Sequence, residues 1–325
     1  MDIALNIGWV ILGLAGLYYG AEWLVRGAAG TAIAAGISTL VVGLTVVAFG
    51  TSMPELIVSI QANLKGSGDF ALGNVVGSNI CNLALVLALA AVMTPIVVHQ
   101  QVVKRELPLL IIVSLVFIAM LRIDNTISRI EGLIFAVGIV AYTLSCILIA
   151  KQNPDDPIAA IEAEVAELGD GEKPNSLTSN ILLVLVGLLV LAVGSDRLVV
   201  GGEFLATRMG VSKAVIALTL VAFGTSLPEL ATTVVACLKG ETELAAGNAI
   251  GSCLFNLLCV IGFTAVIKPI VSTSLATENL VLMVAIPIVF FILLLKNRTL
   301  GRTSGILMLI VYFIYVVYTV FTGKL

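Results

Sequence analysis

Apolar residues occur along this chain in long continuous runs, separated by short polar or charged segments. A transmembrane helix needs about 20 predominantly apolar residues. Because the runs are continuous and do not alternate with polar residues, they favour membrane-spanning helices over a β-barrel. The ten predicted spans cover residues 3–25, 37–65, 70–98, 106–121, 130–150, 179–206, 211–238, 244–270, 277–296 and 303–322.

The composition places this chain in a membrane. Of its 325 residues, 59% are hydrophobic and only 11% are charged, whereas soluble domains carry about 25% charged residues. The mean hydropathy is +1.14, so we expect an all-α integral membrane protein. The first apolar run follows no basic segment, and we interpret it as a retained helix, not a cleaved signal.

Cofactors and macromolecular partners leave little trace in the composition. The net charge is -3 and no basic cluster occurs, so nothing indicates a nucleic-acid partner. The five cysteines all lie in apolar runs and are read as small buried hydrophobic residues. The single histidine, His99, argues against a zinc or haem site. We expect no cofactor and no obligate protein partner, only transported ions and membrane lipids.

The longest polar break covers residues 151–178 and divides the chain into residues 1–150 and 179–325. It contains seven acidic residues, opposed only by Lys173. A calcium-sensing loop is one interpretation, but no EF-hand spacing occurs. A solvated acidic linker between two membrane halves is the favoured interpretation.

The two halves are copies of one unit. Shifting the sequence by 174 residues aligns the halves without a gap from Gly13 to Val97. Val41–Glu55 matches Val215–Glu229 at 11 of 15 positions, and Ala71–Asn82 matches Ala245–Asn256 at 6 of 12. Each half carries five spans, an odd number, so the second half must enter the membrane from the opposite face. The sequence therefore predicts two inverted-topology repeats of five helices, an architecture of many secondary transporters.

The second span of each repeat contains a helix-breaking motif at its middle. Gly50 weakens the helix there, and Pro54 has no backbone N–H to donate to the helical ladder. Proline is accepted in the first turn of a new helix. The segment Ser52-Met53-Pro54-Glu55 also fits the S-x-x-E capping box, as does Ser226-Leu227-Pro228-Glu229. We therefore predict two half-helices, with a break at the membrane centre, in each repeat.

Each break also places a carboxylate, Glu55 or Glu229, near the membrane midplane. The break is expected to free the backbone carbonyls of residues 48–51 and 222–225, and irregular backbone at that depth is tolerated only around a cavity. Carbonyls, hydroxyls and carboxylates form a hard oxygen site, which suits Na⁺ or Ca²⁺ better than a soft metal. The alternative is that both glutamates only cap half-helices, which leaves the cost of burying a full charge unexplained.

The third and eighth spans carry matching polar stripes. In each stripe, two asparagines and a serine recur at i, i+4 and i+8, on one helical face. These residues are Asn74, Ser78 and Asn82 in the first repeat and Asn248, Ser252 and Asn256 in the second. Such residues also act as interhelical packing contacts, and we assign that bracing role to Asn74 and Asn248. The other four are predicted cation ligands.

These motifs carry a family resemblance. The first half contains GTSMPE and GNVVGSN, and the second contains GTSLPE and GNAIGSC. At these positions, and over nearly its whole length, the sequence resembles the calcium/cation antiporter superfamily, in particular its sodium/calcium exchanger branch. The resemblance implies ten helices in two inverted halves, and exchange of three Na⁺ for one Ca²⁺ by alternating access.

The resemblance also implies roles for individual residues. Glu55 and Glu229 would hold the central Ca²⁺ with the carbonyls of Thr51 and Thr225. Other residues would line two flanking Na⁺ sites, one with the Ala48 carbonyl and one with the Ala222 carbonyl. The first flanking set is completed by Ser52 and Ser252, and the second by Ser226 and Ser78. Asn82 and Asn256 would complete the middle of the site.

Two positions depart from the family pattern. Some archaeal and potassium-dependent relatives carry aspartate where this chain has Asn256, so we expect exchange to be independent of K⁺. Cys253 stands where the first repeat has Asn79, which breaks the symmetry of the two motifs.

Charge counting supports the exchanger without the resemblance. Two carboxylates balance one Ca²⁺, whereas three Na⁺ leave a loaded site at about +1, so exchange should move charge across the membrane. One alternative is a H⁺/Ca²⁺ antiporter in which Glu55 and Glu229 carry protons. A more distant one is an intramembrane hydrolase using Ser52 or Ser226, for which His99 is a poorly placed base.

Orientation is not determined by basic residues. Assigning loops alternately places nine Lys and Arg on one side and eight on the other, which gives no positive-inside signal. The family resemblance places residues 151–178 in the cytoplasm, and the protein in a prokaryotic cell membrane.

Overall fold

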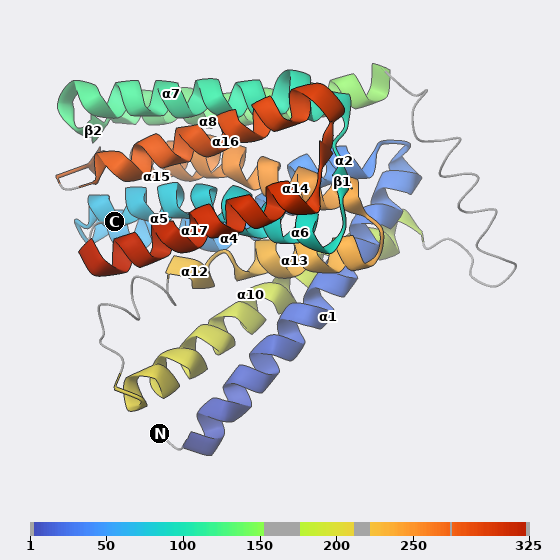
Figure 1. The fold of residues 1–325 in the computed structure, drawn as a ribbon, viewed down its shortest axis with the longest axis horizontal. Coiled ribbons are helices and arrows are strands. Elements are labelled where there is room, and N and C mark those ends of the chain that lie inside the picture. Colours follow the sequence, from blue (N-terminus) through green and yellow to red (C-terminus); the bar gives the residue numbers. More distant parts are fainter. Residues whose placement is uncertain (1–2, 153–175, 211–221, 274, 323–325) are drawn as a thin grey trace, which may run out of the picture.

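The computed structural model describes residues 3–152, 176–210, 222–273 and 275–322, and this part is almost entirely helical (Figure 1). The first half contains helices α1 (Ile3–Ala35), α2 (Thr39–Val42), η1 (Gly43–Val47), α3 (Ala48–Thr51), α4 (Met53–Leu64), α5 (Gly68–Cys81), η2 (Asn82–Leu87), α6 (Ala88–Met93), η3 (Val102–Glu106), α7 (Leu107–Asp124) and α8 (Arg129–Gln152), with strands β1 (Ile96–Val97) and β2 (Thr126–Ile127). The second half contains α10 (Leu177–Arg208), α12 (Ala222–Gly224), α13 (Leu227–Leu238), α14 (Thr242–Phe255), η5 (Asn256–Ile261), α15 (Gly262–Ile267), α16 (Thr277–Asn297) and α17 (Arg302–Thr322), with strands β3 (Ile270–Val271) and β4 (Thr299–Leu300). The elements labelled η are π-helical turns.

Most of the predicted spans are present as helices. In the described part, eight helices are long and apolar enough to cross a membrane. A ninth span is a bent pair, Thr39–Thr51 with Met53–Leu64, whose axes meet at 40°. The break falls at Ser52, as predicted. The predicted span 211–238 is described only from Ala222 onward, and most of the acidic linker lies outside the described residues.

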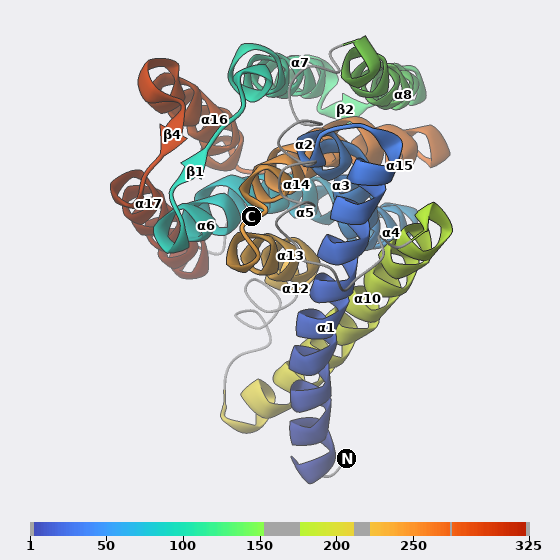
Figure 2. The same ribbon diagram turned by 90° about the vertical axis from the view of Figure 1, so that its right-hand side faces the viewer.

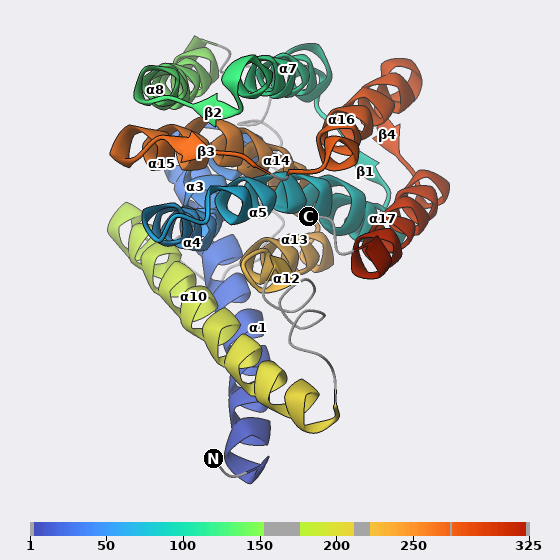
Figure 3. The same ribbon diagram turned by 90° about the vertical axis from the view of Figure 1, so that its left-hand side faces the viewer.

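Helix α1 is longer than predicted and pairs closely with α10. It has 33 residues, or about 50 Å at 1.5 Å per residue, where the apolar run had suggested only 3–25. Arg26 ends that run without ending the helix, because its exposed side chain pairs with Glu22 (3.7 Å). A Cβ added to Gly20 would lie 2.8 Å from the Leu191 nitrogen, so small residues let the two backbones meet. Figures 1 to 3 show this pair projecting from the rest of the bundle.

Two short antiparallel ribbons join the halves. Ile96 of β1 pairs with Leu300 of β4, and Ile127 of β2 pairs with Ile270 of β3. Strand β3 begins 174 residues after β1, at the offset seen in the sequence. Figure 1 shows β1 and β2 at opposite ends of the bundle. Equivalent segments of the two halves therefore make equivalent contacts beyond the motifs themselves.

The inner and outer helices differ in what they expose. Helices α5 and α14, with the π-helical turns that follow them, are mostly buried in the middle of the bundle (Figures 2 and 3). The outer helices α1, α8, α10 and α17 expose large apolar side chains, including Leu14, Leu144, Leu185 and Phe313. Such a surface suits lipid better than water. The bundle thus places the polar stripes of α5 and α14 at its dry centre.

Candidate functional site

The two helix breaks have the same backbone geometry. Ser52 has φ −82° and ψ 2°, and Ser226 has φ −91° and ψ 7°. Both lie near the bridge region, which many active-site residues occupy. A proline follows two residues later and a glutamate three residues later, in the first turn of the new helix. The local sequence therefore places Glu55 and Glu229 at equivalent points of two half-helices.

Each serine at a break contacts the carboxylate of the opposite half. The Ser52 hydroxyl donates to Glu229 Oε1 (3.4 Å), and the Ser226 hydroxyl donates to Glu55 Oε1 (3.1 Å). The predicted capping boxes are wrong, since neither serine side chain caps its own half-helix in the described structure. Packing of the two halves turns each hydroxyl away from its own helix and toward the other carboxylate.

Helix α5 adds a third hydroxyl to this cluster. Ser78 donates to Glu55 Oε1 (3.4 Å) and accepts from Ser226 (3.2 Å). In the other half, the Ser252 hydroxyl lies 3.4 Å from that of Thr51. The predicted hydroxyl residues are thus brought together, in two groups that are similar but not identical.

Asn74 and Asn248 hold the half-helices in place. The Asn74 amide donates to the Glu55 carbonyl (3.3 Å) and to Ser59 (3.0 Å). The Asn248 amide makes the matching bonds to the Glu229 carbonyl (3.4 Å) and to Thr233 (3.2 Å). These contacts agree with the bracing role predicted for both asparagines. They fix the backbone from which each carboxylate projects.

Several polar atoms at the centre are buried and unpaired. Glu55, Glu229, Asn82 and Asn256 all have 0% exposure. Within the described residues, no hydrogen bond reaches Oε2 of either glutamate, Oδ1 of Asn256, or Oδ1 and Nδ2 of Asn82. Asn82 and Asn256 each begin a π-helical turn, a feature frequent at functional sites. Buried oxygens of this kind are the ligands that Na⁺ and Ca²⁺ prefer.

The sequence pattern of this chain matches a family of known proteins. The model of the "Sodium/calcium exchanger protein" family matches residues 5–148 and 179–321, which is most of the chain. The chain belongs to this family.

Individual relatives agree with this assignment. The exchanger chain is 35% identical to the inner membrane protein YrbG of Escherichia coli over 301 residues, covering 92% of each chain. It is 28% identical to the sodium/calcium exchanger MaX1 of Methanosarcina acetivorans, covering 97% of this chain and 98% of that one. The solved structure of the sodium-calcium exchanger NCX_Mj, soaked with 10 mM Na⁺ and 10 mM Sr²⁺, matches with a TM-score of 0.82 at 29% identity. That match covers 97% of this chain and 99% of NCX_Mj.

Family membership makes this exchanger an integral membrane antiporter of cations and Ca²⁺. It is a transporter and not an enzyme, so the intramembrane hydrolase alternative is set aside. The finer questions of counter-ion, stoichiometry and ligand set depend on the centre itself.

The backbone carbonyls of the exchanger differ from expectation at one break. The Ala48 carbonyl, predicted to be free, accepts the Ser52 amide (3.0 Å) and lies 3.4 Å from the Thr51 hydroxyl. In the second half, the Ser226 amide instead donates to Phe223 (3.1 Å), while Ala222 directly follows the residues outside the described range. Loss of the ladder at proline thus does not leave every nearby carbonyl unpaired.

Two further hydroxyl residues of the exchanger were missed. Ser59 and Thr233 accept the bracing amides of Asn74 and Asn248. They lie 174 residues apart, so the repeat alignment itself could have identified them. Thr51 and Thr225, predicted only as carbonyl donors, also donate their hydroxyls to Asn248 (3.1 Å) and Asn74 (3.4 Å). The threonine side chains therefore connect the halves, a role that the sequence did not suggest.

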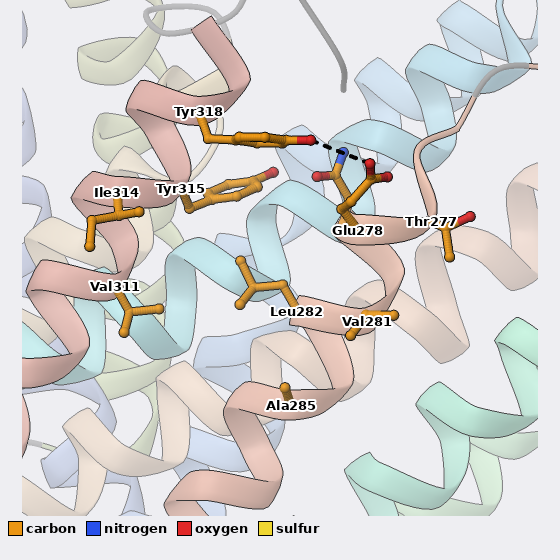
Figure 4. A pocket seen from close by; sticks show the side chains of 10 residues that line it. Thr277, Glu278, Val281, Leu282, Ala285, Val311, Ile314, Tyr315 and Tyr318 are labelled. Carbon is orange, nitrogen blue, oxygen red and sulfur yellow. Dashed lines mark hydrogen bonds between the residues drawn. The ribbon is translucent and has the colours of Figure 1, made fainter. Parts of the chain in front are cut away.

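A cavity of about 750 Å³ lies between α16 and α17, away from both helix breaks (Figure 4). Its walls are mostly apolar, with Leu282, Ala285 and Val311 among the lining residues. At one end the Tyr318 hydroxyl donates to Glu278 (3.3 Å). None of the predicted cation ligands lines this cavity, so it is separate from the candidate site.

Proposed function

We propose that this chain exchanges three Na⁺ for one Ca²⁺ by alternating access, without K⁺. The observation that carries the proposal is the pair Glu55 and Glu229, fully buried and each bonded by a hydroxyl of the opposite half. Neither glutamate forms an ion pair with any described residue. Two buried charges without a counter-charge are costly, so transported cations are the natural source of balance.

The ligand set follows the oxygen atoms gathered at the centre. One Ca²⁺ would be held between Glu55 and Glu229, with the carbonyls of Thr51 and Thr225. The flanking Na⁺ sites would be formed by Ser52, Ser252 and the Ala48 carbonyl, and by Ser226, Ser78 and the Ala222 carbonyl. Asn82 and Asn256 would complete the middle. The short distances among the serines, threonines and carboxylates support this grouping.

The architecture we propose is ten transmembrane helices in two inverted repeats. Residues 1–150 and 179–325 would each form five spans, joined by the acidic linker 151–178. The recurrence of ribbons and bracing contacts at one sequence offset supports two copies of one unit. In a prokaryotic cell membrane the linker would face the cytoplasm. Ions and lipids would be the only obligate partners.

Protons are the competing counter-ion. The unpaired Oε2 atoms of Glu55 and Glu229 would accept a proton each when Ca²⁺ leaves, which gives a H⁺/Ca²⁺ antiporter. The clustered hydroxyls favour Na⁺, because they add neutral oxygen ligands that a proton does not need.

The deciding experiment measures ⁴⁵Ca²⁺ uptake into proteoliposomes. Uptake driven by an outward Na⁺ gradient at equal pH supports the proposal. Uptake that requires a pH gradient and ignores Na⁺ would replace it with proton exchange. Absence of uptake under both gradients would reject Ca²⁺ antiport by these carboxylates.

A further inference from the structure

The two asparagines at the middle of the centre are equivalent in sequence but held differently. The Asn256 amide nitrogen Nδ2 donates to Asn79 Oδ1 (3.1 Å). Asn82, the counterpart of Asn256 in the first repeat, has neither its oxygen nor its nitrogen bonded within the described structure. All three side chains are buried, with exposures of 3% for Asn79 and 0% for the other two. Water therefore does not reach them from the protein surface, and only internal partners fix their orientation.

A chain of hydrogen bonds determines which atom of Asn256 faces the centre. The Asn79 amide nitrogen donates to the backbone carbonyl of Cys253 (3.3 Å). Because a carbonyl only accepts, Asn79 must present its NH₂ group there and its oxygen to Asn256. Asn256 must then present its own NH₂ group to Asn79, which turns its Oδ1 away from that contact. The usual ambiguity of amide orientation is thus resolved by the network.

The equivalent contact on the other side is missing because of one residue. Position 253 lies 174 residues after Asn79 and holds cysteine. The Cys253 thiol donates to the Asn79 carbonyl (3.7 Å) and so reproduces one of the two asparagine bonds. Sulfur is a weak acceptor, however, so Cys253 offers no oxygen to the Asn82 amide.

We propose that Asn79 is a positioning residue that holds the Asn256 amide oxygen toward the transported cation, and that Cys253 deprives Asn82 of the same support. The two halves would then contribute unequally to Ca²⁺ affinity. An oriented oxygen binds a cation without first losing rotational freedom, whereas an unheld amide also presents its NH₂ group, which repels a cation. This inference rests on the proposed function, since it assumes that Asn82 and Asn256 face the transported ion.

Equilibrium ⁴⁵Ca²⁺ binding to the purified exchanger in detergent, without Na⁺, tests the inference. Asn79→Ala should raise the Kd about fivefold, the effect of losing one hydrogen bond of ordinary strength. Cys253→Asn should lower the Kd by a few-fold, because it supplies the missing acceptor for Asn82. Cys253→Ala is the matched control and should leave the Kd unchanged. An unchanged Kd in Asn79→Ala overturns the inference.

A second background separates positioning from simple structural damage. In Asn256→Asp both terminal atoms are oxygens, so the direction in which the side chain is held no longer matters. Adding Asn79→Ala to this background should not raise the Kd further. An equal rise in both backgrounds, with lowered unfolding midpoints, would show that Asn79 only supports packing and would overturn the proposal. Because Kd is measured without a gradient, failure of Na⁺-driven uptake rejects the proposed function and is distinguishable from either result.

Discussion

This bundle buries carboxylates in two different settings. Glu106, at the end of η3, has 0% exposure like Glu55 and Glu229. Its Oε1 accepts from Gln101 (2.9 Å) and lies 3.6 Å from Arg105, whose charge offsets its own. Its Oε2 has no hydrogen bond in the described structure, as at the two central glutamates. An unpaired oxygen therefore does not separate the two settings, but the counter-charge does.

The comparison suggests a physical criterion for a transport site. A structural carboxylate in an apolar bundle carries its own cation, because burying an unpaired charge is costly. The central carboxylates are surrounded by neutral hydroxyls and amides, which stabilise charge without cancelling it. Such a centre requires a positive charge from outside the protein.

The largest effect should come from removing a central charge. Glu55→Gln and Glu229→Gln should each reduce Ca²⁺ binding and exchange by roughly 100- to 1,000-fold, the cost of losing one member of a buried charge pair. Both variants should still fold, because glutamine keeps the volume and an oxygen acceptor. Na⁺-driven ⁴⁵Ca²⁺ uptake and size-exclusion profiles check both expectations. Near-normal flux in either variant would remove that residue from the site.

The charge of the centre should also make exchange depend on voltage. With two carboxylates, three Na⁺ leave about one net positive charge and one Ca²⁺ leaves none. One charge is worth about 2.3 kcal/mol per 100 mV, close to fiftyfold in the Ca²⁺ accumulation ratio. In Na⁺-loaded vesicles, net positive charge leaves as Ca²⁺ enters. An inside-negative potential should therefore slow uptake and an inside-positive one should speed it.

Clamping the potential with an ionophore measures this effect directly. Accumulation that ignores the potential would indicate two Na⁺, or two protons, per Ca²⁺. That result would end the three-sodium stoichiometry while leaving the carboxylate site in place.

Glu106 should behave differently from the central glutamates. Glu106→Gln should retain exchange but destabilise the protein by roughly 1–2 kcal/mol, since Arg105 loses its partner while remaining partly exposed. A drop of a few degrees in the thermal unfolding midpoint is expected. The double variant Arg105→Gln/Glu106→Gln should recover much of this loss, because neither charge is left alone. Loss of exchange in Glu106→Gln, with an unchanged midpoint, would contradict the distinction drawn here.

The smallest expected effect is that of K⁺. With Asn256 in place of an acidic residue, the centre lacks a third carboxylate to balance a further cation. Replacing K⁺ with choline on both sides of proteoliposomes, at a clamped potential, should leave Na⁺-driven Ca²⁺ uptake within twofold, or about 0.4 kcal/mol. Uptake that vanishes in choline would show that Asn256 does not determine K⁺ independence.

Much of the fold follows from the sequence because its causes are local. Continuous apolar runs predict the spans, and proline places the bend at Ser52 since it has no N–H to donate. The offset of 174 residues predicts which segments make matching contacts, including the bracing asparagines. Boundaries were less accurate: α1 continues beyond residue 25, because a charge at the membrane surface ends an apolar run but not a helix.

The partners within the centre depended on tertiary structure. A capping box is a local expectation for Ser52, yet packing of the two halves turns its hydroxyl toward Glu229. The Arg105 that accompanies Glu106, and the absence of such a residue beside the central glutamates in the described structure, likewise depend on how the helices are arranged. Local backbone chemistry determines where a helix breaks and which carboxylate it carries. Only the packing of distant segments decides which group that carboxylate meets.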